Sequence, residues 1–388
     1  MPLEKTELKI GLVPLVDAAP LIVAKEKGFF AAHGLDVTLS VEASWASIRD
    51  KVAAGLLDAA HMLAPMPIAA TLGIDGMRVP MLTAMSLNLN GNAIAVSESL
   101  FWQMQLDDTN PLAVGTQLKH VLQADRAAGA APRVFAHVFP FSTHHYELRY
   151  WLAGCGIDPD RDLQLAVVPP PQMVKSLREG SIDGFCVGAP WSEVAQNDGI
   201  GRVVVRKYQI WNNSPEKVLG VTHAWAHAHP NTHTALIAAL IEASRWIDRT
   251  ENRSEAARLV VEGHYVEAAP EIVHNALKAR TADHPLGRGL VFNEGAATFP
   301  WTSHALWFIQ QMIRWQQAPA DIDARVIAEA SYRPDLYRAA AALVGEPCPK
   351  QDYKPEGEHS RGWRLTDASA PISMGPDLFF DGQHFAGL

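Results

Sequence analysis

The fold is decided by LKIGLVPLVDAAPLIVAKEKGFFAAHGLDVTLSV, residues 8–41. Residues 8–13 predict a short apolar strand, residues 18–33 a helix with Pro20 in its first turn, and residues 36–41 a second strand. A strand, a helix and a strand in this order form a βαβ unit, whose strands pair in parallel. The segment therefore predicts an α/β fold with parallel sheets.

The same alternation continues on both sides of an irregular stretch, residues 97–131. Before it, further strands are predicted at residues 59–63 and 79–84, with helices at 45–54 and 66–73. After it, a second unit is predicted with strands at 133–139, 163–168, 184–187 and 202–205 and helices at 144–154, 172–178 and 190–197. Two similar units in one chain predict two lobes.

Two predicted strands, residues 92–96 and 218–222, carry the chain from one lobe to the other and back. The expected parts are lobe I at 1–96, lobe II at 97–217, a mostly helical second part of lobe I at 218–344, and a tail at 345–388. The tail is rich in Pro, Gly and charge and is expected to extend across the surface. A cleft between two lobes is a natural place for a small-molecule site.

Charge and targeting signals narrow the class of protein. The formal net charge of −9 argues against a nucleic-acid or membrane surface, which needs clustered Lys and Arg. Cys155, Cys186 and Cys348 are widely spaced without a C-x-x-C pair, so buried thiols in a reducing compartment are expected. No signal peptide separates Met1 from the first strand and no apolar run is long enough to span a membrane, so a cytoplasmic protein is expected.

Two strand-to-helix turns carry residues suited to a small oxyanion. Trp45 begins a helix after the N-cap Ser44, and its ring could cover a planar ligand; packing into the lobe interface is the alternative. Thr143 is expected to cap the helix after the strand at 133–139, so that His144 can donate a hydrogen bond toward the cleft. A packed or surface histidine is the alternative there.

Two residues in predicted strands, a glycine and a lysine, are further candidates for the oxyanion site. Gly188 ends a strand and would let a backbone amide approach a ligand closely, or would simply form a tight turn. Lys217 opens an apolar strand, where its ammonium could meet an anion or reach solvent. The sequence contains no serine-hydrolase elbow, phosphate-cradling loop, dinucleotide fingerprint or zinc-protease motif, so no enzyme, metal or cofactor is expected.

From about residue 8 to residue 320, the chain resembles the nitrate- and bicarbonate-binding proteins of the ABC-transporter solute-receptor superfamily. The motifs that carry the resemblance are A-S-W at 43–45, L-N-L-N-G at 87–91, T-H at 143–144, V-V-P-P-P-Q-M-V at 167–174, F-C-V-G at 185–188 and P-E-K at 215–217. The resemblance implies a two-lobed, periplasmic-binding-protein-like (type II) fold with a double-crossing hinge and the ligand between the lobes.

The resemblance also implies a nitrate site. The ligand residues of the family fall on Trp45, His144, Gly188 and Lys217, with Thr143 beside His144. Asn92 stands where the family has a Gln, one methylene longer, so its contact is expected to be absent or water-bridged; Ala189 stands where a Glu is expected. Because bicarbonate-binding relatives carry an acidic residue at the lysine position, Lys217 favours a metal-free nitrate or nitrite site.

Within this family, the lack of a signal peptide makes the chain similar to cytoplasmic nitrate/nitrite sensors of the NasS type. That similarity implies a partner, a NasT-like RNA-binding antiterminator of the ANTAR type. The ligand-free sensor would hold it inactive and release it when nitrate closes the lobes, which controls nitrate assimilation genes. Two alternatives stay open: an extracytoplasmic receptor of a nitrate ABC importer, and a pyrimidine synthase of thiamine biosynthesis, whose Cys-rich motif the three scattered cysteines do not supply.

Overall fold

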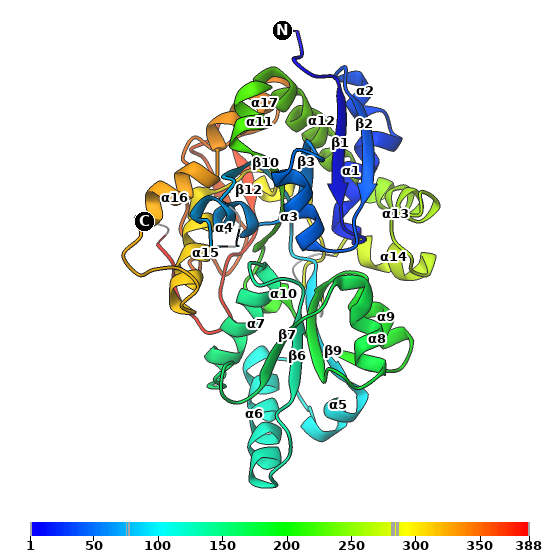
Figure 1. Ribbon diagram of the computed structural model, residues 1–388, viewed down its shortest axis with the longest axis vertical. Coiled ribbons are helices and arrows are strands. Elements are labelled where there is room, and N and C mark those ends of the chain that lie inside the picture. The colour runs from blue at the N-terminus through cyan, green and yellow to red at the C-terminus, as the bar shows by residue number, and fades with distance from the viewer. Residues whose placement is uncertain (1, 75, 77, 281–283, 285–286, 387–388) are drawn as a thin grey trace.

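A computed structural model describes residues 2–74, 76, 78–280, 284 and 287–386 of the chain. Its two lobes lie one above the other in Figure 1, and each is built on a five-stranded sheet with helices packed around it. The two-lobed α/β architecture expected from the sequence is confirmed.

The two sheets share one topology. The first has the order β2 (Asp36–Val41), β1 (Glu7–Leu12), β3 (Ala59–Leu63), β10 (Pro215–Thr222), β4 (Met81–Leu89). The second has the order β7 (Gln164–Val167), β6 (Val134–His137), β8 (Gly184–Gly188), β5 (Asn92–Ser97), β9 (Gly201–Arg206). β10 and β5 run antiparallel to both of their neighbours, so the expectation of purely parallel sheets was wrong. The physical reason is that these two strands reach their sheets from the opposite lobe.

The pairing of the strands shows where the chain crosses from one lobe to the other. Among the described strands, β5 pairs only with β8 and β9, and β10 only with β3 and β4. The first crossing is the turn at Asn90 and Gly91, which have φ angles of 63° and 103°. Lobe II therefore begins by Asn92 and lobe I resumes by Pro215, a few residues earlier than the divisions expected after residues 96 and 217.

The first helices of lobe I match the sequence prediction in part. Ser44 accepts a hydrogen bond from the Ser47 amide at 3.2 Å and caps α3 (Trp45–Ala53), as expected. The helix expected at 18–33 is broken, because Gly28 has a φ of 79°. The pieces are η1 (Val16–Ala18), α1 (Ala19–Glu26) and α2 (Phe29–Ala32).

Several other helices of the βαβ units and of lobe II follow the sequence prediction, with two additions in the irregular stretch. The additions are α5 (Glu98–Met104) and α6 (Pro111–Ala127). The predicted ones are α4 (Met66–Leu72), α7 (Thr143–Gly154), α8 (Met173–Arg178) and α9 (Trp191–Asn197). The short helices η2 (Pro170–Gln172) and α10 (Lys207–Ile210) were not predicted.

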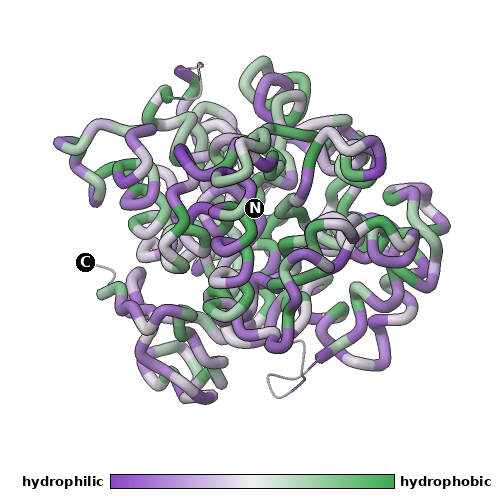
Figure 2. The backbone as a smooth tube through the Cα atoms, turned by 90° about the horizontal axis from the view of Figure 1, so that it is seen from below, coloured by the Kyte–Doolittle hydropathy of each residue, from purple (hydrophilic) through white to green (hydrophobic). Residues whose placement is uncertain are grey.

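The helices after the second crossing cover lobe I. α12 packs on α1 and α2, α16 on α4, and α17 on β4. These helices are α11 (His223–Ala228), α12 (Pro230–Asp248), η3 (Thr250–Asn252), α13 (Arg253–Glu262), α14 (Pro270–Leu277), η4 (Glu294–Ala296), α15 (Thr302–Arg314), α16 (Ala324–Ser331) and α17 (Pro334–Leu343). Hydrophobic and hydrophilic stretches alternate along the tube in Figure 2, and none of the described helices is long and apolar enough to cross a membrane.

The C-terminal tail is anchored rather than merely extended. It forms a short antiparallel hairpin of β11 (Trp363–Leu365) and β12 (Ile372–Met374) on lobe I. Farther on, the Phe379 ring stacks on Trp211 with centroids 4.9 Å apart, and Tyr150 Oη of α7 donates to Asp381 Oδ1 at 2.9 Å. Most of the described tail residues are exposed or half-buried, and buried apolar side chains such as Phe379 anchor the tail to lobe II.

Replacing Phe379 with alanine should lower the free energy of unfolding by about 3–5 kcal/mol, the usual cost of deleting a buried aromatic ring. The ring is 4% exposed and packs against Trp211 and Trp307. Tryptophan fluorescence during urea unfolding would follow this change. Leu343→Ala is the control, since Leu343 is 68% exposed. A loss below about 1 kcal/mol for Phe379→Ala would mean that the tail does not stabilise the fold.

Candidate functional site

The site lies where the two lobes meet and is centred on the start of β10. The register of β10 against β4 shifts on both sides of Lys217. In a regular strand, Glu216 and Lys217 would point to opposite faces, but bulges re-aim side chains. As a result both side chains enter one buried cluster, and both are 0% exposed.

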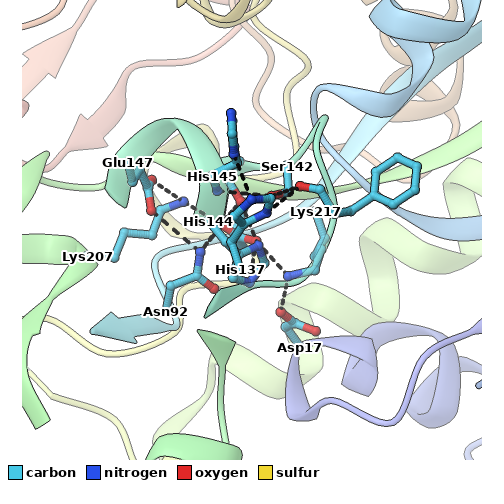
Figure 3. A network of polar contacts seen from close by, with 12 residues as sticks. Asp17, Asn92, His137, Ser142, His144, His145, Glu147, Lys207 and Lys217 are labelled. Atoms are coloured by element: carbon cyan, nitrogen blue, oxygen red, sulfur yellow. Dashed lines mark hydrogen bonds and ion pairs between the residues drawn. The ribbon is translucent and has the colours of Figure 1, made fainter. Parts of the chain in front are cut away.

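Lys217 is held by two carboxylates. Its Nζ donates to Asp17 Oδ2 at 2.7 Å and to Glu216 Oε1 at 2.6 Å, and Figure 3 shows the lysine and Asp17 facing each other. Burial alone would lower the pKa of Lys217. The negative charges of Asp17 and Glu216 outweigh burial, so the pKa of Lys217 is raised above its ordinary value. The side chain therefore stays charged, and the alternative that it reaches solvent is excluded.

Glu216 accepts hydrogen bonds from both lobes. Its Oε2 accepts from Thr143 Oγ1, from Asn92 Nδ2 at 2.6 Å and from Lys207 Nζ at 2.5 Å. Burial would raise the pKa of Glu216, yet Lys207 and Lys217 outweigh burial and hold it well below the ordinary value. Glu216 is thus an ionised carboxylate that ties lobe I to β5, α7 and α10 of lobe II.

Thr143 therefore does not act as the expected helix cap. Ser142 is the N-cap of α7, since its Oγ accepts from the His145 amide at 3.0 Å. The Thr143 hydroxyl is free to donate to Glu216 instead. This arrangement aims the positive N-terminal end of α7 at the carboxylate, which favours the ionised form.

A second lysine completes the cluster on the lobe II side. Lys207 Nζ donates to Glu147 Oε1 at 2.7 Å, to Glu216 Oε2 and to the Pro215 carbonyl at 2.7 Å, so three acceptors surround its ammonium. The dashed lines in Figure 3 join Glu147 to Lys207 and to Asn92. Burial raises the pKa of Glu147 to about 7, although Lys207 acts in the opposite direction.

Two histidines in the cluster are neutral. Burial lowers the pKa of His144 to about 3, and its Nε2 lies 3.6 Å from Glu216 Oε1. Burial also lowers the pKa of His61, although its Nε2 lies 3.0 Å from Asp17 Oδ1. Each neutral ring keeps one N–H to donate and carries no charge at pH 7.

Trp45 and Gly188 border the same cluster. Lys217 Nζ lies 5.5 Å from the centre of the Trp45 ring, so the indole does form a flat wall beside the ammonium. A Cβ added at Gly188 would stand 3.4 Å from both Asn92 Oδ1 and Asp17 Oδ2. The absence of a side chain at residue 188 therefore keeps space next to these polar groups.

Several buried polar atoms of the cluster have no hydrogen-bond partner among the described residues. They are Trp45 Nε1, His61 Nδ1, Asn92 Oδ1 and His144 Nε2. Buried groups of this kind are nearly always paired in proteins. Their gathering around one ammonium indicates a place for a small polar ligand.

The lobes are in direct contact around this place. The Val16 amide donates to the Ala189 carbonyl at 3.0 Å, and Trp191 Nε1 donates to the Pro14 carbonyl at 3.1 Å. The adjoining cavity, lined by Asn92, Ala189 and Arg206 among others, has a volume of about 20 Å³. That volume holds about one water, so a larger ligand requires the lobes or side chains to part.

All six residues predicted from the sequence lie in this cluster: Trp45, Asn92, Thr143, His144, Gly188 and Lys217. Sequence reasoning missed Asp17, His61, Glu147, Lys207 and the role of Glu216. The available signal was a charged residue inside an apolar run, which holds for Asp17. Among the described residues, no three His, Cys, Asp or Glu side chains gather as a metal site.

The sequence of the chain was compared with those of known proteins. Residues 1–261 match the NMT1-like family. The chain is 34% identical over 399 residues to the nitrate/nitrite binding protein NrtA of Nostoc sp., covering 98% of this chain and 83% of that protein. It is 38% identical over 347 residues to the bicarbonate transport ATP-binding protein CmpC of Synechococcus elongatus, covering 88% of this chain and 50% of that protein. The chain thus spans about half the length of CmpC.

A solved structure is similar over its whole length. The crystal structure of the periplasmic nitrate-binding protein NrtA from Synechocystis PCC 6803 superposes with a TM-score of 0.86 at 31% identity, covering 100% of this chain and 97% of that one. The predicted periplasmic-binding-protein-like fold is therefore confirmed. The expectation that the chain is not an enzyme is also confirmed, since these NrtA homologues are substrate-binding proteins.

Proposed function

Because this chain belongs to the NMT1-like family, among relatives that include NrtA, we propose that it binds nitrate or nitrite between its two lobes. One observation carries the proposal. Of the six residues that the sequence pattern predicts, Lys217 supplies one buried ammonium, and the other five gather around its cluster from both lobes. Trp45 Nε1 and His144 Nε2 lie in the same cluster and have no hydrogen-bond partner among the described residues.

The chemistry of the cluster suits a small planar monoanion. An ammonium has three N–H donors, and those of Lys217 already reach Asp17 and Glu216, which leaves one for an anion. The His144 imidazole and the Trp45 indole can each donate to another oxygen. In a buried site these charge-assisted hydrogen bonds are stronger than in water.

Calorimetric titration of the purified chain tests this proposal. Nitrate or nitrite should bind, and bicarbonate with calcium or an alkanesulfonate should bind more weakly or not at all. If nitrate and nitrite both fail to bind, the proposal is wrong. If bicarbonate with calcium binds more tightly than either, the preference assigned to Lys217 is wrong.

Gly188→Ala should weaken nitrate binding by about tenfold or more, equivalent to about 1.4 kcal/mol. The added methyl group would meet its neighbours at 3.4 Å, an ordinary contact distance, so folding should be little affected. It would occupy the space through which the backbone amide approaches the anion. Titration with nitrate and thermal unfolding of the same samples separate the two effects. Wild-type affinity in Gly188→Ala would remove this glycine from the site.

We further propose that the chain works as a cytoplasmic nitrate/nitrite sensor of the NasS type that sequesters a NasT-like ANTAR-domain antiterminator. The support is the resemblance to such sensors, together with the net charge of −9, which suits a partner that is RNA-binding and basic in places. A ligand can release such a partner only if it binds the two lobe arrangements with different affinity.

The second candidate is the receptor of a nitrate importer. It is favoured by the similarity to NrtA of Synechocystis, which is described as a periplasmic nitrate-binding protein. Mixing the chain with a purified ANTAR-domain antiterminator, with and without nitrate, distinguishes the two. A complex on size-exclusion chromatography that nitrate dissociates supports the sensor. No complex in either condition, with nitrate-dependent stimulation of an importer ATPase in vesicles, supports the receptor.

A further inference from the structure

The charges of the cluster do not balance. Asp17, Glu147 and Glu216 supply three carboxylates, whereas Lys207 and Lys217 supply two ammonium groups. Every one of these side chains is at most 2% exposed. If all five are ionised, the buried cluster carries one excess negative charge before any ligand arrives.

No other group that faces the cluster from the described residues supplies the missing positive charge. His61 on β3 and His144 on α7 are neutral, because burial lowers the pKa of each. Cys186 on β8 keeps its proton, because burial and the nearby carboxylates raise its pKa. Thr143 on α7 and Asn92 on β5 are uncharged donors. A monovalent anion would therefore bring the cluster to two excess negative charges in a place with little water to screen them.

We propose that the site takes up one proton from solvent with each nitrate-class anion, and that the Glu147 carboxylate receives this proton. This inference rests on the proposed function and names a co-ligand of the same site. The anion and the proton together add no net charge, so the buried cluster ends with the charge it had at the start.

Glu147 is the carboxylate with the weakest contacts to lose, because its one ammonium is shared and its other contact is long. Glu216 accepts from Asn92, Thr143, Lys207 and Lys217, and Asp17 contacts both Lys217 and His61. Glu147 shares Lys207 with Glu216 and otherwise meets only the Asn92 amide, at 3.5 Å. Its pKa of about 7 agrees with this assignment.

Protonation of Glu147 also has a structural consequence for the anion. Lys207 then has a single charged acceptor, Glu216, at 2.5 Å. In the structure, Lys217 Nζ donates to the other carboxylate oxygen of Glu216, Oε1, at 2.6 Å. A stronger Lys207–Glu216 ion pair weakens this hydrogen bond. The Lys217 ammonium can then turn toward the incoming anion while Asp17 keeps its place.

Proton uptake can be measured by titrating nitrate into the full chain in two buffers of different ionisation enthalpy, at pH 6 and at pH 8. At pH 6 the free protein mostly holds the proton already, so uptake should be about 0.1 per nitrate; at pH 8 it should approach about 0.9. The dissociation constant should rise toward about tenfold per pH unit above pH 7.

Glu147→Gln mimics the protonated side chain and should abolish both the uptake at pH 8 and the rise in dissociation constant. Glu179→Gln is the matched control, since Glu179 is an exposed lobe II glutamate that pairs only with Lys175 among the described residues. It should behave as the wild type.

Binding without proton uptake at pH 8 would overturn this inference alone. Uptake near one proton already at pH 6 would overturn the assignment to Glu147 and favour His144. The wild-type titrations decide these points even if Glu147→Gln fails to fold. Absence of nitrate and nitrite binding at every pH would overturn the proposed function, and this inference with it.

Discussion

Lys217→Met should weaken nitrate binding at least ~100-fold, because it removes the only charged donor assigned to the anion. Lys207 cannot take its place, since three acceptors already surround Lys207 Nζ. Methionine keeps most of the volume of the lysine stem, so the change tests the charge rather than the packing. Calorimetric titration with nitrate measures it directly.

The same substitution should also change how stability depends on pH. Lys217 helps hold the pKa of Asp17 below its ordinary value, against the effect of burial. The stability from this pair is present above the unfolded pKa of about 3.9 and is lost as the pH falls through the lower folded value. In Lys217→Met this contribution should be missing at neutral pH. Lys175→Met, which changes an exposed lysine on α8, is the control.

A nitrate affinity of Lys217→Met within about threefold of the wild-type value would contradict the role of Lys217.

Lys207→Met should cause the largest loss of stability, about 3–5 kcal/mol, because it leaves Glu147 and Glu216 buried without their shared counter-ion. Denaturant unfolding at pH 7.5 would measure the loss. The variant should recover part of its stability as the pH falls, because the loss of Lys207 raises the pKa of Glu147 further and protonation then removes the one carboxylate left without a counter-ion; Glu216 keeps Lys217.

A double variant separates this electrostatic cause from a packing defect. Glu147→Gln added to Lys207→Met removes one unpaired carboxylate and should restore about 1–3 kcal/mol of the stability lost at pH 7.5. If the double variant is no more stable than Lys207→Met, then lost packing rather than unpaired charge explains the defect.

Elements with a clear hydrophobic period were predicted closely. β2 and β3 begin and end at the predicted residues. Both are apolar runs bounded by turn residues, and such a run allows only one placement of the strand. α6 was missed although Asn110 caps it and Pro111 occupies its first position, a known signal for a helix start. The break at Gly28 was missed because a single glycine within a helical pattern is often tolerated.

The site was predicted in outline but not in its electrostatics. The motif positions named the six residues that meet between the lobes. Asp17 and Glu147 escaped notice because they lie 200 and 70 residues from Lys217 in the chain. The fold of lobe I brings Asp17 to Lys217, and the contact between the lobes adds Glu147 to the cluster. The bulge in β10 was equally hidden, since strand periodicity sends Glu216 and Lys217 to opposite faces. A lysine that seemed available to an anion is therefore already paired with two carboxylates.

A crystal structure of the chain grown with saturating nitrate tests the central claim most directly. The account predicts one nitrate between the lobes, within hydrogen-bond distance of Lys217 Nζ and His144, close to the backbone at Gly188 and beside the Trp45 ring. Lys217 Nζ should keep Asp17 and lose Glu216 as a partner. A nitrate bound elsewhere, with Lys217 still joined to both carboxylates, would contradict it.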